Sequence, residues 1–372
     1  MISEVERRRV VEGCRKAADL LMGYPWKLWF WGDSIGVEGL LDASEVTGDG
    51  KYAGFVYGLF KGWIPRMEHR SRFEHTAPGA ALVRSYTITH DPSLLKAARA
   101  HADYLNAFRR SKSGCPIHYE DVAFNLAPEL PSTRHRLQKR MIAESAKYPI
   151  PPEPCVFVDS VHFQGPFLAA LYSVTGEERY LKQAESTIGP QVELLWDEDD
   201  HLFHHFWVEK SERRNGVFWG RGNCWALLGM LSTLEYLPSR DPLSRRLKRI
   251  VVKQASKMAG LQDPSGDWHT VLDDPGAYLE SSIAAFVTSG FTLAIKNGWL
   301  PDSYQKVVEL AWHATWRHLK KDGLFAGVSY ETHPNFTAAH YRNMPRDAMV
   351  PWGQGPFLAA CRSRLGAPRR RI

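Results

Sequence analysis

Side chains that can transfer protons stand next to aromatic rings in several short segments of the chain. The candidate site residues in these segments are Asp33, Glu74, His75, His118, Asp159, His204, His205, Trp219, Arg221, Trp225, Glu280 and Trp352. Aromatic rings stack on the C–H faces of sugars, while carboxylates and imidazoles move protons. The fork of an arginine suits a carboxylate on the ligand. The combination favours a binding site for an acidic sugar.

Asp159 is the central acid in this prediction. It follows the apolar run CVFV and opens the apolar segment SVHFQGPFLAAL. The alternative role for Asp159 is that of a helix N-cap, and Asp33 and Glu280 have the same alternative. His204 and His205 are adjacent, so we expect only one of them to face a pocket. For each tryptophan the alternative is packing in the core.

Helices must position these residues, because apolar side chains recur at i, i+3, i+4 and i+7 through most of the chain while alternation with period two is scarce. The pattern predicts an all-α fold. The expected helices cover residues 3–22, 34–45, 52–65, 77–89, 92–108, 159–175, 178–195, 224–237, 242–262, 278–298, 302–319 and 353–365.

The expected helices form pairs whose joints resemble one another, as in VTGD and VTGE, where a glycine suits a left-handed helix C-cap. Small residues near the joints, such as Gly36, Gly39, Gly165 and Gly355, would let inner helices approach closely. A stacked solenoid is the alternative to a closed ring. The repeat length varies and aromatic residues gather at the starts of the inner helices, which favours six hairpins closed into an (α/α)6 barrel.

The segment 121–155 is rich in Pro, Arg and Lys and is too long for an ordinary connection between helices. We expect it to be an excursion with a role in function or in oligomer contacts. No low-complexity linker separates two halves of the chain. The sequence therefore predicts a single catalytic domain over residues 1–372.

Composition limits the class of protein. The 372 residues are 44% hydrophobic, and no run approaches the roughly 20 apolar residues of a membrane span. The N-terminal segment lacks the pattern of a signal peptide, so we expect a cytoplasmic protein. Five cysteines without a CxxC motif indicate reduced thiols. We expect no metal and no cofactor.

The net charge of +6 is compatible with an anionic ligand. The basic clusters are short and lie near the chain ends, at residues 7–9 and 369–371. Elsewhere Lys and Arg alternate with acids, which argues against nucleic acid. The expected partner is an acidic oligosaccharide substrate, with no membrane partner, and the chain is expected to be a monomer or a homodimer.

The order of FVDSVHFQGPFLAAL, FHHFW, FWGRGNCWALLGMLSTLEYLP, DWHTVLDDPGAYLESSIAAF and WGQGPFLA resembles glycoside hydrolase family 105, the unsaturated rhamnogalacturonyl hydrolases. It resembles family 88, the unsaturated glucuronyl hydrolases, more distantly. The similarity extends from about Trp26 to Leu365, and its most specific parts are the VDS helix start and WGRGNCW. The resemblance implies an (α/α)6 barrel, in agreement with the helix pattern.

The resemblance also implies roles. Asp159 matches the general acid/base of the family, and Asp33 matches a pocket residue that is an asparagine or an acid. The other substrate-binding positions are expected at His118, His205, Trp219, Arg221, Trp225 and Trp352. Phe157 stands where tryptophan is usual, and Cys224 where glycine is usual.

One position departs from the family pattern. A second catalytic aspartate is expected four residues before Gly79, and this chain has His75 there with Glu74 beside it. Three interpretations stay open: His75 takes the role, Glu74 reaches in, or the chemistry has changed.

The leading hypothesis is a hydrolase that removes a 4,5-unsaturated uronic acid from the non-reducing end of lyase-generated oligosaccharides by hydrating the C4=C5 vinyl ether. The alternatives are a glycosidase of the same fold acting on a saturated uronide or another sugar, with Glu74 or Glu280 beside Asp159, or a sugar epimerase or isomerase that uses its histidines. A binding protein without catalysis is the fourth possibility.

Overall fold

The computed structural model describes residues 2–26, 31–69, 75–118, 143, 147, 153–346 and 348–366. Its α-helices, apart from α13, lie close to the twelve that the periodicity predicts. They are α1 (Glu4–Met22), α2 (Trp31–Thr47), α3 (Lys51–Trp63), α4 (Gly79–Thr89), α5 (Pro92–Asn106), α7 (Ser160–Thr175), α8 (Glu178–Leu195), α9 (Gly220–Leu234), α10 (Pro242–Gly260), α11 (Ser281–Lys296), α12 (Gln305–His318), α13 (Ala338–Arg342) and α14 (Pro351–Arg364).

Local sequence explains where several helices begin and end. α5 and α10 each start with a proline that follows an aspartate, and the aspartate side chain accepts a hydrogen bond from the first turn. Gly48 and Gly176, the glycines of VTGD and VTGE, both have φ of 68°. Since this left-handed conformation favours glycine, the predicted C-caps are confirmed.

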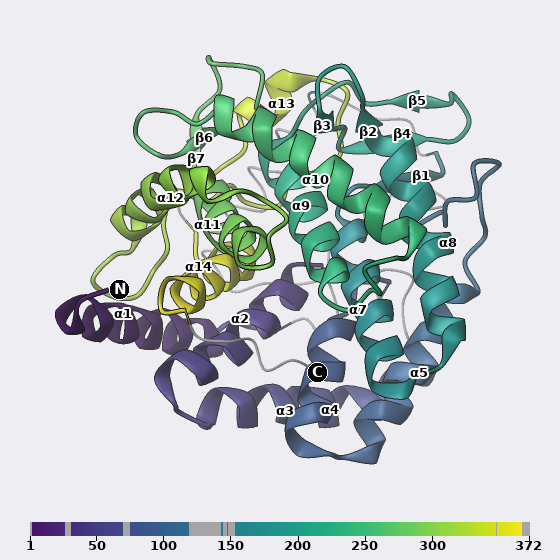
Figure 1. The fold of residues 1–372 in the computed structure, drawn as a ribbon, viewed down its shortest axis with the longest axis horizontal. Coiled ribbons are helices and arrows are strands. Elements are labelled where there is room, and N and C mark those ends of the chain that lie inside the picture. The colour runs from purple at the N-terminus through teal and green to yellow at the C-terminus, as the bar shows by residue number, and fades with distance from the viewer. Residues whose placement is uncertain are drawn as a thin grey trace.

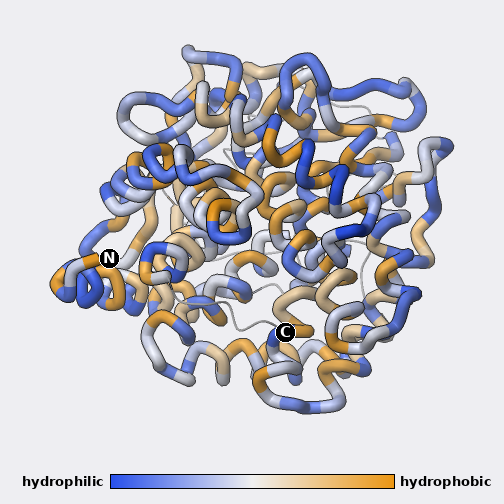
Figure 2. Tube along the Cα trace, viewed as in Figure 1, coloured by the Kyte–Doolittle hydropathy of each residue, from blue (hydrophilic) through white to orange (hydrophobic). Residues whose placement is uncertain are grey.

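Six helices form a closed inner ring in the order α2, α4, α7, α9, α11 and α14, with α14 packed against α2. α1, α3, α5, α8, α10 and α12 alternate with them along the chain and form the outer layer, where hydrophilic and hydrophobic turns alternate, as along α1 and α10 (Figure 2). The N-terminal α1 lies beside the C-terminal α14 (Figure 1). The predicted (α/α)6 barrel is confirmed.

Glycines allow the inner helices to cross closely. A Cβ built on Gly39 of α2 would lie 2.6 Å from Cα of Gly355 in α14, and one on Gly229 of α9 would lie 2.6 Å from the backbone of His162 in α7. No real Cβ tolerates such a contact, so neither position accepts a larger residue without movement of a helix. The prediction of small residues at the inner contacts holds for Gly39 and Gly355.

Short strands connect the helices on one side of the molecule, away from α3, α4 and α5 (Figure 1). β1 (Cys155–Phe157) pairs antiparallel with β4 (Phe206–Val208), and β4 with β5 (Arg213–Arg214). β2 (Trp196–Asp197) pairs with β3 (Leu202–Phe203), and β6 (Trp268–His269) with β7 (Leu279–Glu280). Each strand has only two or three residues, too few for a period-two pattern to show in the sequence.

Some features differ from the sequence prediction. α9 begins at Gly220 rather than at residue 224, and α13 and two 3-10 helices, η1 (Ile64–His69) and η3 (Asp302–Tyr304), were not expected as separate elements. Most of the segment 121–155 lies outside the described residues, so its role stays a prediction, as does the single domain. All five cysteines are buried free thiols. Among the described helices, none has the length and apolar character needed to cross a bilayer.

Candidate functional site

The candidate residues gather where the inner helices begin. Each outer helix carries the chain back between two inner ones, so the inner N-termini share one end of the ring, which we call the mouth. The rings of Trp31 and Trp352, in the first turns of α2 and α14, are 4.4 Å apart. The mouth residues are Asp33 in α2, His75 before α4, Asp159 before α7, Trp219 and Arg221 at the start of α9, Glu280 before α11 and Trp352 in α14.

Strand pairing brings Asp159 and His205 together. The β1–β4 ladder aligns Phe157 with Phe206, and the backbone N–H of Val158 donates to the carbonyl of His205 over 2.9 Å. The two side chains therefore face each other, with His205 Nε2 3.6 Å from Asp159 Oδ2. Asp159 occupies the N-cap position of α7 but makes no capping hydrogen bond. Its carboxyl group is thus not used as a helix cap.

The Asp159 carboxyl is only partly shielded from solvent. Its side chain is 14% exposed, while Oδ2 itself is buried. The exposed part of the side chain therefore belongs to its remaining atoms. A carboxyl in this position is accessible to a ligand and has one oxygen directed into the protein.

His205 is held by several neighbours. Its Nδ1 lies 2.6 Å from the hydroxyl of Tyr341, and its backbone N–H donates to Oδ1 of Asn215 over 3.0 Å. The Trp219 ring packs against its imidazole with a centroid distance of 4.4 Å. Burial, and then the charge of Asp159, raise the pKa of Tyr341, so the phenol stays protonated near neutral pH.

His204 points elsewhere, as expected for adjacent histidines. Its Nε2 lies 3.2 Å from Asp197 Oδ2, and its ring stacks on Phe218. Burial lowers the pKa of His204 in spite of the carboxylate. The two neighbouring histidines thus form two separate contacts with aspartates, and only that of His205 involves Asp159.

His118 uses both ring nitrogens inside the protein. Nδ1 lies 3.1 Å from the hydroxyl of Ser160, and Nε2 lies 3.2 Å from the side-chain amide of Gln191 and 3.3 Å from that of Gln164. Burial, and then the neighbouring His75, hold the pKa of His118 well below its usual range. His118 is therefore a neutral anchor for the first turns of α7, and a contact with substrate stays a prediction.

His75 stacks in parallel on His118, with ring centroids 4.8 Å apart and planes inclined by 4°. Both rings are buried. The ring stack and the contact between His118 and Ser160 connect His75 to the residue next to Asp159, so a direct catalytic role for His75 stays a prediction. Glu74, the other candidate for the second acid, lies outside the described residues.

Arg221 and Glu280 form a fully buried ion pair, with Nη1 2.9 Å from Oε1 and neither side chain exposed. Arg221 also donates to the carbonyl of Ser329 over 3.2 Å and to that of Tyr330 over 3.1 Å. Glu280 accepts in addition from the Ser282 hydroxyl over 2.6 Å. Both terminal nitrogens of the predicted fork therefore have partners within the protein, and the pair fixes the segment after residue 328 against α9. A contact of Arg221 with a substrate carboxylate stays a prediction.

The candidate tryptophans differ in how close they lie to the Asp159–His205 pair. Trp219 covers His205 and Arg221, whose guanidinium carbon is 4.7 Å from its ring centroid. Trp225, one turn after Arg221, packs on Phe163 and Phe286 in the core. Trp352 donates from Nε1 to the carbonyl of Ser329 over 2.9 Å. Asp33 is 1% exposed. Of these, Trp219 has the most direct contact with the Asp159–His205 pair.

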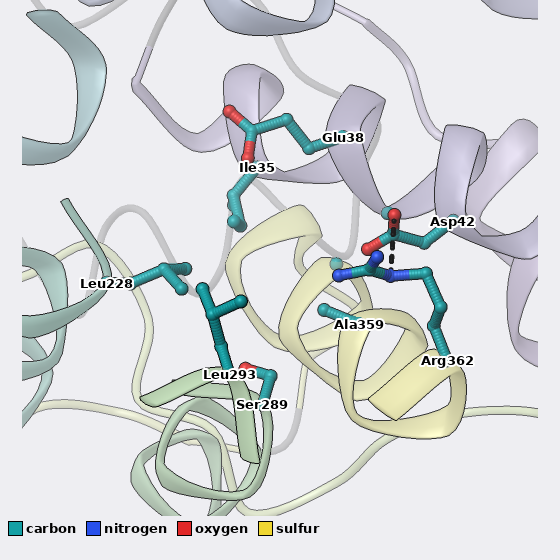
Figure 3. Close-up of a pocket in the computed structure, with 10 residues that line it drawn as sticks. Ile35, Glu38, Asp42, Leu228, Ser289, Leu293, Ala359 and Arg362 are labelled. Carbon is teal, nitrogen blue, oxygen red and sulfur yellow. Dashed lines mark ion pairs between the residues drawn. The ribbon is translucent and has the colours of Figure 1, made fainter. Parts of the chain in front are cut away.

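A small cavity lies deeper in the ring, between α2, α9, α11 and α14 (Figure 3). Its volume of about 20 Å³ is enough for one water molecule. Asp42 pairs there with Arg362 over 3.1 Å and also with Arg84 over 2.7 Å. This cavity is far too small for a sugar, and its charges cross-link inner helices.

Sequence reasoning missed Tyr341, Asn215, Gln164 and Gln191, which surround the two site histidines. Tyr341 lies on the short helix α13, 136 positions from His205. A local sequence pattern cannot predict a contact over this separation. Within the described part of the chain, no group of three or more His, Cys, Asp or Glu side chains is arranged to hold a metal ion.

Known proteins share this fold over nearly the whole chain. A crystal structure described as a possible member of the GH105 family, from Salmonella enterica serovar Paratyphi A, superposes with a TM-score of 0.81 at 21% identity, covering 98% of this chain and 95% of that one. The unsaturated glucuronyl hydrolase of Bacillus sp. GL1 superposes with a TM-score of 0.68 at 17% identity, covering 97% of each chain.

Sequence comparison agrees. The chain is 26% identical over 336 residues to the unsaturated rhamnogalacturonyl hydrolase YesR of Bacillus subtilis, covering 89% of this chain and 88% of that protein. It is 30% identical over 161 residues to an unsaturated 3S-rhamnoglycuronyl hydrolase of Alteromonas sp., covering 42% of this chain. The model of Glycosyl Hydrolase Family 88 matches residues 7–366. The chain is therefore a glycoside hydrolase and belongs to glycosyl hydrolase family 88.

Proposed function

We propose that this enzyme removes a 4,5-unsaturated uronic acid from the non-reducing end of oligosaccharides that a polysaccharide lyase has cut, with Asp159 as general acid and base. The observation that carries the proposal is the partly exposed Asp159 carboxyl at the mouth, beside His205 and free of any capping role. One relative along most of the chain is an unsaturated rhamnogalacturonyl hydrolase by name, which supports the substrate class.

The unsaturated uronic acid is a vinyl ether, so one acid can start the reaction. Asp159 gives its proton to C4, and the positive charge that develops is shared by C5 and the ring oxygen. The Asp159 carboxylate then takes a proton from water as the water oxygen bonds to C5. The resulting hemiketal opens and releases the next sugar of the chain. Asp159 gives one proton and takes one back, so it is protonated again at the end of the cycle.

Helix dipoles favour an acidic substrate at this end of the barrel. The N-terminal ends of six inner helices converge on the mouth, and each carries a partial positive charge. The net charge of +6 has the same sign. This field attracts the substrate carboxylate, even though Arg221 is already paired with Glu280.

The contacts of Glu280 inside the protein argue against a glycosidase mechanism in which Glu280 is the second catalytic carboxylate. In such enzymes the two carboxyl groups flank the glycosidic bond, and both must reach the substrate. Glu280 is fully buried, and its oxygens accept from Arg221, Ser282 and Ser329. A hydration mechanism needs only the one accessible acid, which is what Asp159 offers.

The test uses the ultraviolet absorbance of the C4=C5 double bond, which disappears when water adds. Purified protein is incubated with unsaturated disaccharides prepared from several polysaccharides by lyases. We expect loss of absorbance with at least one of them, and Asp159→Asn should lower the rate by about 10²–10⁴ because the proton donor is gone.

Asp197→Asn is the control, since Asp197 also lies beside a buried histidine, with 3.2 Å between its Oδ2 and Nε2 of His204, but is not part of the mouth. It should keep most of the activity. Full activity in Asp159→Asn, or release of a saturated sugar with the double bond intact, would refute the proposal.

A further inference from the structure

The hydroxyl of Tyr341 lies at the centre of four polar groups. Nδ2 of Asn215 donates to it over 3.2 Å, and the backbone N–H of Asn335 donates to it over 3.3 Å. The carbonyl of Asn335 lies 3.2 Å away, and Nδ1 of His205 lies 2.6 Å away. Tyr341, His205 and Asn215 are all buried, so water does not compete freely for these contacts.

The orientation of the Asn215 amide is fixed by its other contacts. Its Oδ1 accepts from the backbone N–H of His205 over 3.0 Å and from that of Phe206 over 3.4 Å. An oxygen must therefore occupy that position, and the NH2 group must face Tyr341 and the carbonyl of Asn335, to which it also donates over 3.1 Å. The amide cannot flip to accept from the phenol.

A phenol oxygen has two lone pairs and one proton. Asn215 and the Asn335 N–H occupy both lone pairs, so the hydroxyl has no further capacity to accept a hydrogen from His205. Its own proton must go to an acceptor, and Nδ1 of His205 at 2.6 Å is closer than the Asn335 carbonyl at 3.2 Å. Nδ1 therefore accepts and carries no proton.

We propose that Tyr341 is a positioning residue that holds His205 as the neutral tautomer with its proton on Nε2, directed at Oδ2 of Asp159. The consequence for catalysis rests on the proposed function. Nε2 lies 3.6 Å from the buried Oδ2, beyond hydrogen-bond distance, so the interaction is that of the Nε2–H dipole with the carboxyl group, and the acidic proton is placed on Oδ1, away from that dipole. When Asp159 has given that proton away, the Nε2–H dipole stabilises the carboxylate that remains. His205 acts as a fixed dipole beside Asp159 and not as a second base.

Nitrogen-15 NMR reads the tautomer directly, without substrate. Protein labelled at histidine shows pyridine-like and pyrrole-like ring nitrogens at well-separated shifts, and long-range couplings to the ring protons identify each one. The signals of His205 are those absent from His205→Gln. We expect a pyridine-like Nδ1 and a protonated Nε2 in the wild type near neutral pH. A protonated Nδ1 in the wild type would overturn the inference, and this measurement requires no variant of Tyr341.

Tyr341→Phe removes the hydroxyl and leaves the ring. We expect the Nδ1–H tautomer to become populated and kcat to fall about tenfold with KM nearly unchanged, since the carboxylate of the intermediate state loses the favourable Nε2–H dipole. The matched control is Tyr52→Phe in α3. It removes the hydroxyl of another buried tyrosine, which donates a hydrogen bond to Oδ1 of Asp19 over 2.8 Å. It should alter neither the His205 signals nor kcat.

The outcomes separate this inference from the proposed function. If no unsaturated uronate is consumed but the His205 tautomer still changes in Tyr341→Phe, the positioning role stands and the proposed substrate is wrong. If hydrolysis occurs but His205 keeps Nε2–H unchanged in Tyr341→Phe, the substrate is right and the role of Tyr341 is refuted.

Discussion

Replacing Glu280 by glutamine tests whether the Arg221–Glu280 pair is a structural part of the barrel. Glutamine keeps the shape of the side chain but cannot neutralise Arg221, and both side chains are 0% exposed. One of the two Glu280 oxygens, which accept hydrogen bonds from Ser282 and Ser329, would be replaced by an NH2 group that cannot accept. Breaking a buried pair by removing one partner costs about 3–5 kcal/mol.

The expected change in melting temperature follows from chain length. At about 2.1 cal/mol/K per residue, unfolding all 372 residues has an entropy of about 0.8 kcal/mol/K. A loss of about 4 kcal/mol therefore lowers Tm by roughly 5 °C, which calorimetry resolves easily. The control is Glu209→Gln, because Glu209 binds Arg109 through both oxygens at an exposed site, with 45% of the Arg109 side chain accessible. Its Tm should change by about 1 °C or less.

The alternative role for Arg221 gives the opposite result. If Arg221 binds the substrate carboxylate, as the family resemblance implies, Arg221→Met raises KM and leaves Tm near that of the wild type. The structure predicts a lower Tm for Arg221→Met, and a smaller loss in the double variant with Glu280→Met, which leaves no buried charge. A wild-type Tm in Glu280→Gln together with a raised KM in Arg221→Met would refute the structural role.

Two further predictions concern stability. Burial lowers the pKa of His118 in the folded state, so the unfolded chain binds more protons below about pH 6.5. The free energy of unfolding therefore does not depend on the titration of His118 above that pH. Below it, the free energy of unfolding falls by up to about 1.4 kcal/mol per pH unit. Urea unfolding at several pH values should show this slope, and His118→Gln should reduce it; an equal slope in both proteins would contradict the assignment. Gly355→Ala places a Cβ against the backbone of Ile35 and should cost about 1–3 kcal/mol, whereas Gly58→Ala in α3, where a Cβ meets nothing within 4 Å, should stabilise the protein by up to about 1 kcal/mol. Equal effects of the two substitutions in denaturant would show that the α2–α14 crossing can relax.

The helices could be predicted from the sequence because their information is local. The period of the apolar residues, the Asp-Pro starts of α5 and α10 and the glycines of the VTG joints each lie within one helix or turn. α13 has only five residues, too few for a periodic pattern to develop. β1 and β4 depend on pairing between segments about 50 residues apart.

The site could be predicted only in part, for the same reason. Residue types and the family resemblance identified Asp159 and His205 as candidates, and the structure places them next to each other. Neither indicated that Arg221 pairs with Glu280, 59 positions away, or that Tyr341 contacts His205. Such contacts depend on how six hairpins close, and no single segment contains that information.

The contact between the two ends of the chain has a consequence for synthesis. Gln354 in the last helix donates to the carbonyl of Ala17 in the first over 3.1 Å, and α14 fills the gap between α2 and α11. While the ribosome is still making residues before 351, the sides of α2 and α11 that pack against α14 in the folded protein have no partner. Newly made chains are therefore exposed to aggregation until α14 emerges. Because α1 and α14 are neighbours, a linker can join them, and the chain can be opened at an exposed turn such as Gly176. This circular permutant should form the same ring, with a different hairpin synthesised last.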